Sequence, residues 1–320
     1  MRFRTFFLAL SMVAGVAAAQ TYPDKAIPLK LVVPFGTGGA ADVLARAYAK
    51  GITEVSGLNV VVDNRPGAEG AIGVQAVMNA QPDGYTIMLG SSSLTVLNPV
   101  TVPNLQYDPL RDLIPAVGLS KNFPVVHLGP STKFKTVHDF IAAAKANPGK
   151  YSFGHATATS RLSGELFESL SGTKLLSVGY KTTAAGALAL AAGEIDMYIL
   201  DSGSMKPFVD GGKVRALAVA SSTRLASAPQ LPTMREEGVP NYDVTAWFAV
   251  YFGAKTPSEK MPVMQDILQK ATKAKSFTDV LSTLYMEPFH ATSEEITAIT
   301  RRDIDRWKKV ARNPGVASGK

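Results

Sequence analysis

LKLVVPFGTGGAAD, residues 29–42, decides the fold of this 320-residue chain. An apolar run of strand length ends in a glycine-rich turn, and a helix is expected from residue 42 to 55. Its apolar residues share one face, whereas the opposite face carries Asp42, Arg46, Lys50 and Glu54, the pattern of a helix that lies on a sheet. Strands expected at 58–63 and 85–89 end in similar small-residue turns. Such turns, at the carboxyl ends of parallel strands, are where open α/β sheets hold small ligands.

A second series of strands and helices follows in the middle of the chain. The pattern predicts strands at 151–155, 175–179, 195–200 and 214–220, with helices between the first three and another at 136–146. This spacing is typical of βαβ units, so we expect a second parallel sheet.

The fold class that follows is α/β with two lobes, each a mainly parallel sheet flanked by helices. A chain of this length usually splits into two units, and no low-complexity linker separates the two series. We therefore expect strands to cross between the lobes near 116–126 and 244–252. Lobe one would hold residues 20–122 plus 248–320, and lobe two residues 123–247.

The carboxyl-terminal region carries two capping-box sequences, Thr256–Glu259 and Thr292–Glu295. Each would place a hydroxyl and a carboxylate on unpaired amides at a helix start. They predict helices at 257–275 and 293–312 that pack together as a terminal pair.

The first twenty residues have the pattern of an export signal. Arg2 and Arg4 precede an apolar core at 6–16, and Ala17–Ala19 forms an A-x-A cleavage site. The competing interpretation, a membrane anchor, needs an apolar run of about 20 residues, which this segment does not reach. We expect residues 1–19 to be a signal peptide, cleaved near Ala19, and the mature protein to be periplasmic.

Composition and motifs exclude several classes. The net charge is +7, but the basic residues are scattered, which does not favour nucleic-acid binding. The chain has no cysteine, and its four histidines lack metal-ligand spacing. Neither a nucleophile elbow nor a Walker phosphate loop occurs. We expect no catalysis, no cofactor and no metal.

One enzyme alternative remains open. Residues 36–41 match G-x-G-x-x-A between a strand and a helix, and Asp63 closes the next strand, which is the outline of a dinucleotide site. The alternative function is therefore an NAD-dependent oxidoreductase that uses the turn Gly36-Thr37-Gly38. Against it, Pro34-Phe35 interrupts the approach to the first glycine, and Asp63 falls late. The preferred interpretation is an amide-lined anion site at a helix N-terminus.

Motifs along the whole mature chain resemble the Bug-type periplasmic receptors of tripartite tricarboxylate transporters. In order, these are Pro34-Phe35 with Gly38-Gly39 and Asp42, Asn64–Ala68 with Gly70 and Gly73, Pro82–Thr86, Tyr107–Pro109 with Asp112, Ala146–Lys150, Gly164–Phe167, Tyr180-Lys181, Gly212–Val219 and Trp247-Phe248. Each motif alone is short, but their number and order identify the family.

The resemblance implies a two-lobed Venus-flytrap receptor that hands a small organic carboxylate to membrane permease subunits and performs no chemistry. A monomer is expected. The residues that it implies for the ligand lie at expected strand ends or helix starts. They are Phe35, Gly36, Thr37, Gly38, Gly39 and Ala40, the serine turn Ser91, Ser92 and Ser93, and, from lobe two, Thr159, Ser160, Tyr180, Asp201 and Ser202.

Departures from the family pattern bear on which carboxylate is bound. Arg161 stands where a histidine is common, and it would suit the distal carboxylate of a dicarboxylate because a guanidinium binds carboxylates bidentately. If Phe35, Tyr180 and Trp247 also line the site, an aromatic dicarboxylate such as terephthalate would fit. Asp201 has two interpretations, a partner for a ligand amino group or a structural acid of the turn.

Overall fold

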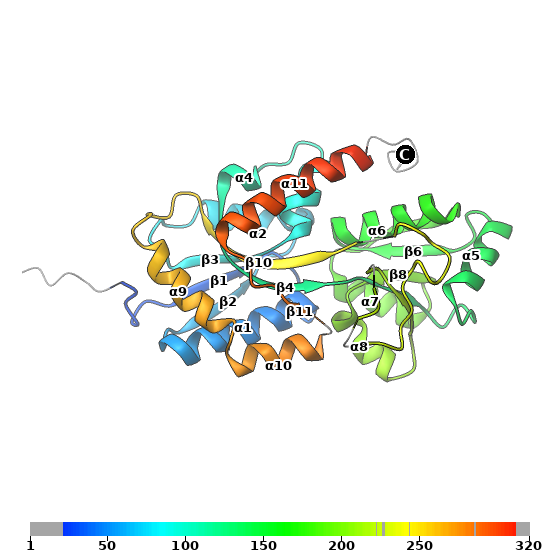
Figure 1. Cartoon of the computed structure of the whole chain (residues 1–320), viewed down its shortest axis with the longest axis horizontal. Helices are drawn as coiled ribbons and strands as arrows, with labels where there is room; N and C mark the ends of the chain where they lie inside the picture. Colours follow the sequence, from blue (N-terminus) through cyan, green and yellow to red (C-terminus); the bar gives the residue numbers. More distant parts are fainter. Residues whose placement is uncertain (1–21, 222, 226–227, 243, 285, 312–320) are drawn as a thin grey trace, which may run out of the picture.

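A computed structural model describes residues 22–221, 223–225, 228–242, 244–284 and 286–311. It shows two sheets, each flanked by helices, that lie end to end along the molecule (Figure 1). The two-lobed α/β class is therefore confirmed. The expected signal peptide lies outside the described residues. No helix of the described part of the chain is long and apolar enough to span a bilayer.

The first sheet has six strands in the order β11-β4-β10-β3-β1-β2. Its elements come from both ends of the described chain. They are β1 (Leu29–Val33), α1 (Ala40–Ser56), β2 (Val60–Asn64), the short helix Ala68–Gly70, α2 (Ala71–Met78), β3 (Thr86–Ser91), a π-helical turn (Ser93–Leu97), α3 (Asn98–Thr101), α4 (Pro109–Asp112), β4 (Leu113–Asn122), β10 (Ala246–Gly253), α9 (Met261–Ala271), α10 (Lys275–Thr283), β11 (Glu287–Pro288) and α11 (Ser293–Ala311).

The second sheet has five strands in the order β7-β6-β8-β5-β9. Its elements are consecutive in the sequence. They are β5 (Val125–Leu128), α5 (Val137–Ala146), β6 (Ser152–His155), α6 (Ala158–Ser171), β7 (Leu176–Gly179), α7 (Thr183–Ala192), β8 (Met197–Leu200), α8 (Ser202–Asp210) and β9 (Arg215–Val219). The proposed lobe boundaries fall beside the end of β4 and inside β10, and they stay predictions.

Both sheets are mixed, which corrects the expectation of mainly parallel sheets. The strands joined by helices are parallel, as β1 is with β2 and β3, and β6 with β7 and β8. However, β4 pairs antiparallel with β10, and β5 pairs antiparallel with β8 and β9. The reason lies in the crossings. The chain leaves lobe one through β4 and returns through β10, so these two neighbours must run in opposite directions (Figure 1).

Helix α1 shows how the sequence pattern becomes packing. Leu44, Tyr48 and Ile52 are fully buried against the first sheet, as the apolar face predicts. Val55, at the helix end, is instead exposed. Asp42 also departs from the expected pattern. Its spacing places it on the charged, solvent-facing side of the helix, yet only 5% of its surface is exposed.

The terminal helices do not form the expected pair. Helices α9 and α10 contribute to the same apolar core as α1, whereas α11 belongs to the core on the other face of the sheet. The Thr292 capping box is confirmed, because Thr292 Oγ1 accepts from the Glu295 amide and Glu295 accepts from the Thr292 amide. The Thr256 box is wrong, since α9 starts at Met261 and ends at Ala271, ahead of a separate helix α10.

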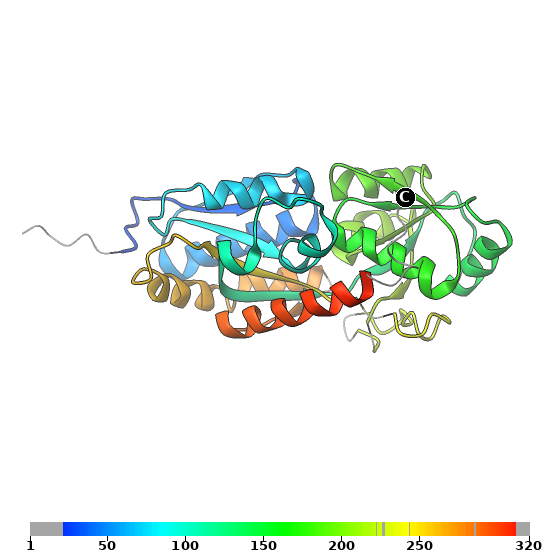
Figure 2. The same ribbon diagram turned by 90° about the horizontal axis from the view of Figure 1, so that it is seen from above.

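The second lobe has two main cores and a smaller apolar cluster around Val125 and Val219. One holds an aromatic group from α5, α6 and β6, including Phe140, Phe153 and Phe167. The other is formed largely by α7 and α8. Each lobe therefore has the layers helix, sheet and helix (Figure 2).

Gly118 on β4 predicts a stability effect. A Cβ there would overlap the carbonyl oxygen of Phe289 and lie 3.1 Å from the Ala291 amide nitrogen, and backbone atoms give way poorly. We expect Gly118→Ala to lower the free energy of unfolding by about 1–3 kcal/mol, the usual cost of overpacking. The measurement is urea unfolding. The matched control is Gly179→Ala, also in a strand, where the nearest atom is the His155 ring at 3.3 Å. Equal losses in both variants would contradict the argument.

Candidate functional site

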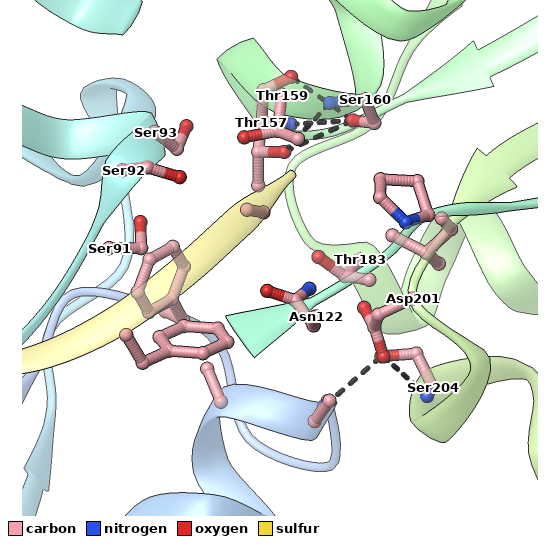
Figure 3. A pocket seen from close by; sticks show the side chains of 18 of the residues that line it. Ser91, Ser92, Ser93, Asn122, Thr157, Thr159, Ser160, Thr183, Asp201 and Ser204 are labelled. Carbon is pink, nitrogen blue, oxygen red and sulfur yellow. Dashed lines mark hydrogen bonds between the residues drawn. The ribbon is translucent and has the colours of Figure 1, made fainter. Parts of the chain in front are cut away.

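A cavity lies between the two lobes (Figure 3). Residues from both sheets and from the starts of several helices line it. They are Phe35, Gly36, Gly39, Ala40, Ala41, Ser91, Ser92, Ser93, Asn122, Pro124, Thr157, Thr159, Ser160, Thr183, Ile199, Leu200, Asp201, Ser204, Ala246, Trp247 and Phe248. Small-molecule sites occur preferentially at such junctions between two units of a fold.

Helix N-termini define the electrostatics of this cavity. Helices α1, α6, α7 and α8 all begin at its wall, α1 from lobe one and the others from lobe two. Each helix start presents amide groups and the positive end of the helix dipole, which together favour an anion. No lysine, arginine or histidine is among the lining residues of the described chain. An anion here would therefore rely on amides and hydroxyls.

The β1–α1 turn is held in shape by Asp42. Its carboxylate accepts from the Gly38 amide at 3.0 Å and from Asn64 Nδ2 at 3.1 Å, and it forms an ion pair with Arg46 at 3.0 Å. Gly38 has φ 79°, a conformation that suits glycine. Burial alone would raise the pKa of Asp42, but the hydrogen bonds from Arg46, Gly38 and Asn64 outweigh it and lower the pKa. Asp42 is thus a support of the turn.

The serine turn lies on the lobe-one side (Figure 3). Ser91 ends β3, and Ser93 starts the π-helical turn. All three serines of the turn are buried. Ser92 Oγ accepts from the Trp247 amide at 3.3 Å, whereas Ser91 Oγ has no partner among the described residues. Buried hydroxyls are nearly always hydrogen-bonded, so the Ser91 hydroxyl is available for a hydrogen bond to a ligand or a water molecule.

Two helix starts of lobe two, those of α6 and α7, are capped by threonines and face the serine turn. Thr157 caps α6, since its Oγ1 accepts from the Ser160 amide at 3.2 Å while Ser160 Oγ accepts from the Thr157 amide at 3.1 Å. Thr182 caps α7 by accepting from the Ala185 amide. The capping side chains fix the geometry of the first turns, and therefore the positions of Thr159 and Thr183 on the cavity wall.

Asp201 is the one charged side chain among the described lining residues, and it caps α8. Its Oδ1 accepts from the Ser204 amide at 2.8 Å, and its Oδ2 accepts from Ser204 Oγ at 3.2 Å. Ser204 Oγ also accepts from the Ala40 amide of lobe one at 3.1 Å. Burial raises the pKa of Asp201, although the bonds from Ser204 oppose that rise. This arrangement favours the structural interpretation of Asp201.

Ten of the residues expected to bind ligand line the cavity. They are Phe35, Gly36, Gly39, Ala40, Ser91, Ser92, Ser93, Thr159, Ser160 and Asp201. Trp247 lines it too. The binding roles of these residues stay predictions.

The structure places five expected residues elsewhere. Thr37, Gly38 and Arg161 are not on the cavity wall. Tyr180 lines a neighbouring groove that shares Phe35 and Gly36 with the cavity. Ser202 lines a separate hollow of lobe two.

Arg161 lies one residue beyond Ser160, which turns its side chain about 100° around α6. Its charge acts on His155, whose pKa is lowered first by burial and then by Arg161, and on Glu165.

Several lining residues were missed from the sequence. The polar ones are Asn122, Thr157, Thr183 and Ser204, and the apolar ones are Ala41, Pro124, Ile199, Leu200, Ala246 and Phe248. A signal existed for Thr157, which lies two residues after the strand expected at 151–155, in a place where N-cap residues are common. Nothing local marked Asn122, which ends a crossing strand. Among the described residues, no group of three or more potential ligands could hold a metal.

Comparison with known proteins agrees with this geometry. The model of the tripartite tricarboxylate transporter family receptor matches residues 44–316. Protein BugT of Bordetella pertussis is 32% identical over 313 residues, covering 97% of this chain and 95% of that protein. R. palustris Rpa4515, solved with adipate, superposes with a TM-score of 0.85 at 30% identity, covering 91% of this chain and 98% of that one. The periplasmic binding protein BugD gives 0.84 at 28% identity, covering 90% and 98%.

The fold and the cavity define a two-lobed solute-binding protein. The chain belongs to the family of tripartite tricarboxylate transporter receptors, and it is a Bug-type periplasmic receptor rather than an enzyme. The dinucleotide alternative is thereby wrong. Asp63 is paired with Arg65 at 2.9 Å, and the Ala40 amide of the glycine turn is engaged by Ser204.

The raised pKa of Asp201 predicts a pH dependence. As pH rises above about 4, the unfolded state loses this proton before the folded state does, so the contribution of Asp201 to stability falls with rising pH. Asp201→Asn keeps an N-cap and has no proton to lose. We expect the stability of the parent relative to this variant to fall as pH rises from 4 towards 7, measured by urea unfolding. A difference that stays constant with pH would contradict the raised pKa.

Proposed function

We propose that this receptor captures a small organic dicarboxylate in the interlobe cavity and delivers it to a membrane permease of the tripartite tricarboxylate type. The observation that carries the proposal is the convergence of four helix N-termini from both lobes on a cavity whose lining, in the part of the chain that the structure describes, includes no cation. Such a site compensates negative charge through backbone amides.

The arrangement offers two places for a carboxylate. On the lobe-one side, the start of α1 lies beside the serine turn, which adds hydroxyl donors. On the lobe-two side, the starts of α6 and α7 present Thr157, Thr159, Ser160 and Thr183. A molecule with a carboxylate at each end would bridge the two sides. Rpa4515, one of the similar structures, was solved with adipate, a linear dicarboxylate.

Apolar side chains support a hydrocarbon spacer between the two carboxylates. Phe35, Trp247 and Phe248 form an aromatic part of the wall, and Phe35 meets Phe248 edge to face with ring centres 6.2 Å apart. Aromatic rings pack favourably edge to face or offset. Both a linear spacer and the ring of an aromatic dicarboxylate such as terephthalate would be accommodated by this chemistry.

The remaining parts of the proposal concern the cell. Residues 1–19 act as a signal peptide that is removed near Ala19, and the mature protein works in the periplasm as a monomer. Its partners are the permease subunits. The export pattern of the sequence and the family to which the chain belongs support this placement.

A thermal-shift screen tests the ligand class. Adipate, succinate, terephthalate, citrate, benzoate and NADH would each be added to the mature protein. A bound dicarboxylate at about 100 times its dissociation constant should stabilise the folded state by about 2.7 kcal/mol, and benzoate should stabilise it less. Calorimetry would then give the affinity. Stabilisation by benzoate as strong as by any dicarboxylate would contradict the two-ended site, and stabilisation by NADH alone would contradict carboxylate binding.

A pair of capping threonines separates binding from folding. Thr157→Val removes the cap of α6 at the cavity, and Thr136→Val removes the equivalent cap of α5, where Thr136 Oγ1 accepts from the Asp139 amide at 3.0 Å. Both variants should lose about 1 kcal/mol of stability. Only Thr157→Val should weaken carboxylate binding, because α6 starts at the cavity and α5 does not. Equal affinity in the two variants would argue against α6 as a binding element.

A further inference from the structure

The start of helix α8 touches lobe one directly. Ser204 Oγ accepts from the Ala40 amide at 3.1 Å, and it donates to Asp201 Oδ2 at 3.2 Å. The hydroxyl therefore connects the carboxylate that caps α8 with the first turn of α1 (Figure 3). This bond joins residues that are 164 positions apart in the chain.

The neighbouring Gly203 packs where no side chain fits. A Cβ at this position would lie 2.5 Å from Leu284 Cδ2, 3.2 Å from Leu284 Cβ and 3.3 Å from Ala40 Cβ. Leu284 is buried in the core of lobe one. Helix α8 reaches α1 and the end of α10 because residue 203 is glycine. Neither Gly203 nor Leu284 lines the cavity.

A second contact between the lobes lies at the β1–α1 turn. A Cβ at Gly36 would lie 2.8 Å from Thr182 Cγ2, the cap of α7. Both contacts involve the turn or the first residue of α1, and they add to the packing of Ala158 and Leu162 of α6 in the core of lobe one. The residues that make these contacts supply few of the polar groups free for a ligand, because Ser204 already bonds to Asp201 and Ala40.

We propose that Ser204 and Gly203 form a latch that holds the closed receptor together, and that Ser204 sets affinity as a positioning residue. The proposal rests on the proposed function of reversible ligand capture. A contact made only in the closed state shifts the balance between open and closed forms by the same factor for every ligand that needs closure. The latch would therefore change the affinity for every ligand by the same factor, whereas a side chain that contacts the ligand would change some affinities more than others.

The energetic size of the latch follows from its bond. Losing one neutral hydrogen bond corresponds to a loss of about two- to tenfold in an equilibrium constant. The loss should come mainly from faster ligand release, as for most changes of affinity within one site. Asp201 keeps its cap in Ser204→Ala, because Oδ1 accepts from the backbone amide of residue 204, so α8 should stay folded.

The test compares Ser204→Ala with Thr159→Val, a cavity residue outside the latch. Calorimetry and stopped-flow kinetics would be run with adipate, succinate and terephthalate on each variant and on the parent. We expect Ser204→Ala to weaken every ligand that binds the parent by the same factor, about two- to tenfold. Thr159→Val should change the order of preference among ligands. A loss for Ser204→Ala that differs between ligands, or no loss, would overturn the latch.

Gly203→Val provides a test that involves no cavity residue. The added side chain would collide with Leu284, so the variant should bind every ligand at least as weakly as Ser204→Ala. Small-angle scattering with saturating ligand should show it more open than the parent. The double variant Gly203→Val with Leu284→Ala should recover part of the affinity, since the colliding atoms are removed. Parent-like affinity in Gly203→Val would overturn the proposal.

A readout without ligand keeps the two proposals separate. If the parent binds none of the carboxylates, the proposed function fails. The latch is then measured by hydrogen exchange in the ligand-free protein. The Ala40 amide should exchange faster in Ser204→Ala than in the parent, whereas amides in the middle of α1 should not change. Equal exchange at Ala40 in both proteins would overturn the latch independently of any ligand.

Discussion

Under the proposed function, the site depends on one constraint: an anion must be held in a cavity whose described lining residues include no cationic side chain. Backbone amides can meet this demand only if several helices begin at the same place. Parallel β–α units deliver a helix start at the carboxyl end of a strand, and two lobes that face each other bring such ends together. Helix α1 comes from one lobe, and α6, α7 and α8 come from the other. The two-lobed fold therefore supplies the several helix starts that an anion site built on backbone amides requires.

Much of the fold could be predicted because its signals are local. The apolar period of α1, the glycine turn before it and the capping pair Thr292–Glu295 each act within a few residues. Strand direction at the crossings has no such signal. Whether β4 and β10 run parallel or antiparallel depends on how the chain travels between lobes. The burial of Asp42 was not predicted for a related reason. Its hydrogen bonds with Gly38 and Asn64 form only when the turn and the neighbouring strand have folded together.

The candidate site divides in the same way. Residues that follow strands or open helices, such as Ser91 and Thr159, could be identified from the order of elements. Asn122 and Ser204 could not, because they reach the cavity only through the way the lobes meet. Arg161 shows the limit of spacing arguments, since one position along a helix decides whether a side chain faces a cavity or a neighbour.

The paired crossing strands have a mechanical consequence. Strands β4 and β10 are hydrogen-bonded to each other from Leu113 and Gly253 to Asn122 and Ala246, and this last pair lies at the border between the lobes. The two crossings therefore leave the first sheet side by side, from one hydrogen-bonded pair of strands, and not from separate places on the sheet. The ladder of backbone hydrogen bonds keeps these two exit points together. A rotation of one lobe against the other would accordingly have its axis at the end of this ladder, beside Asn122 and Ala246.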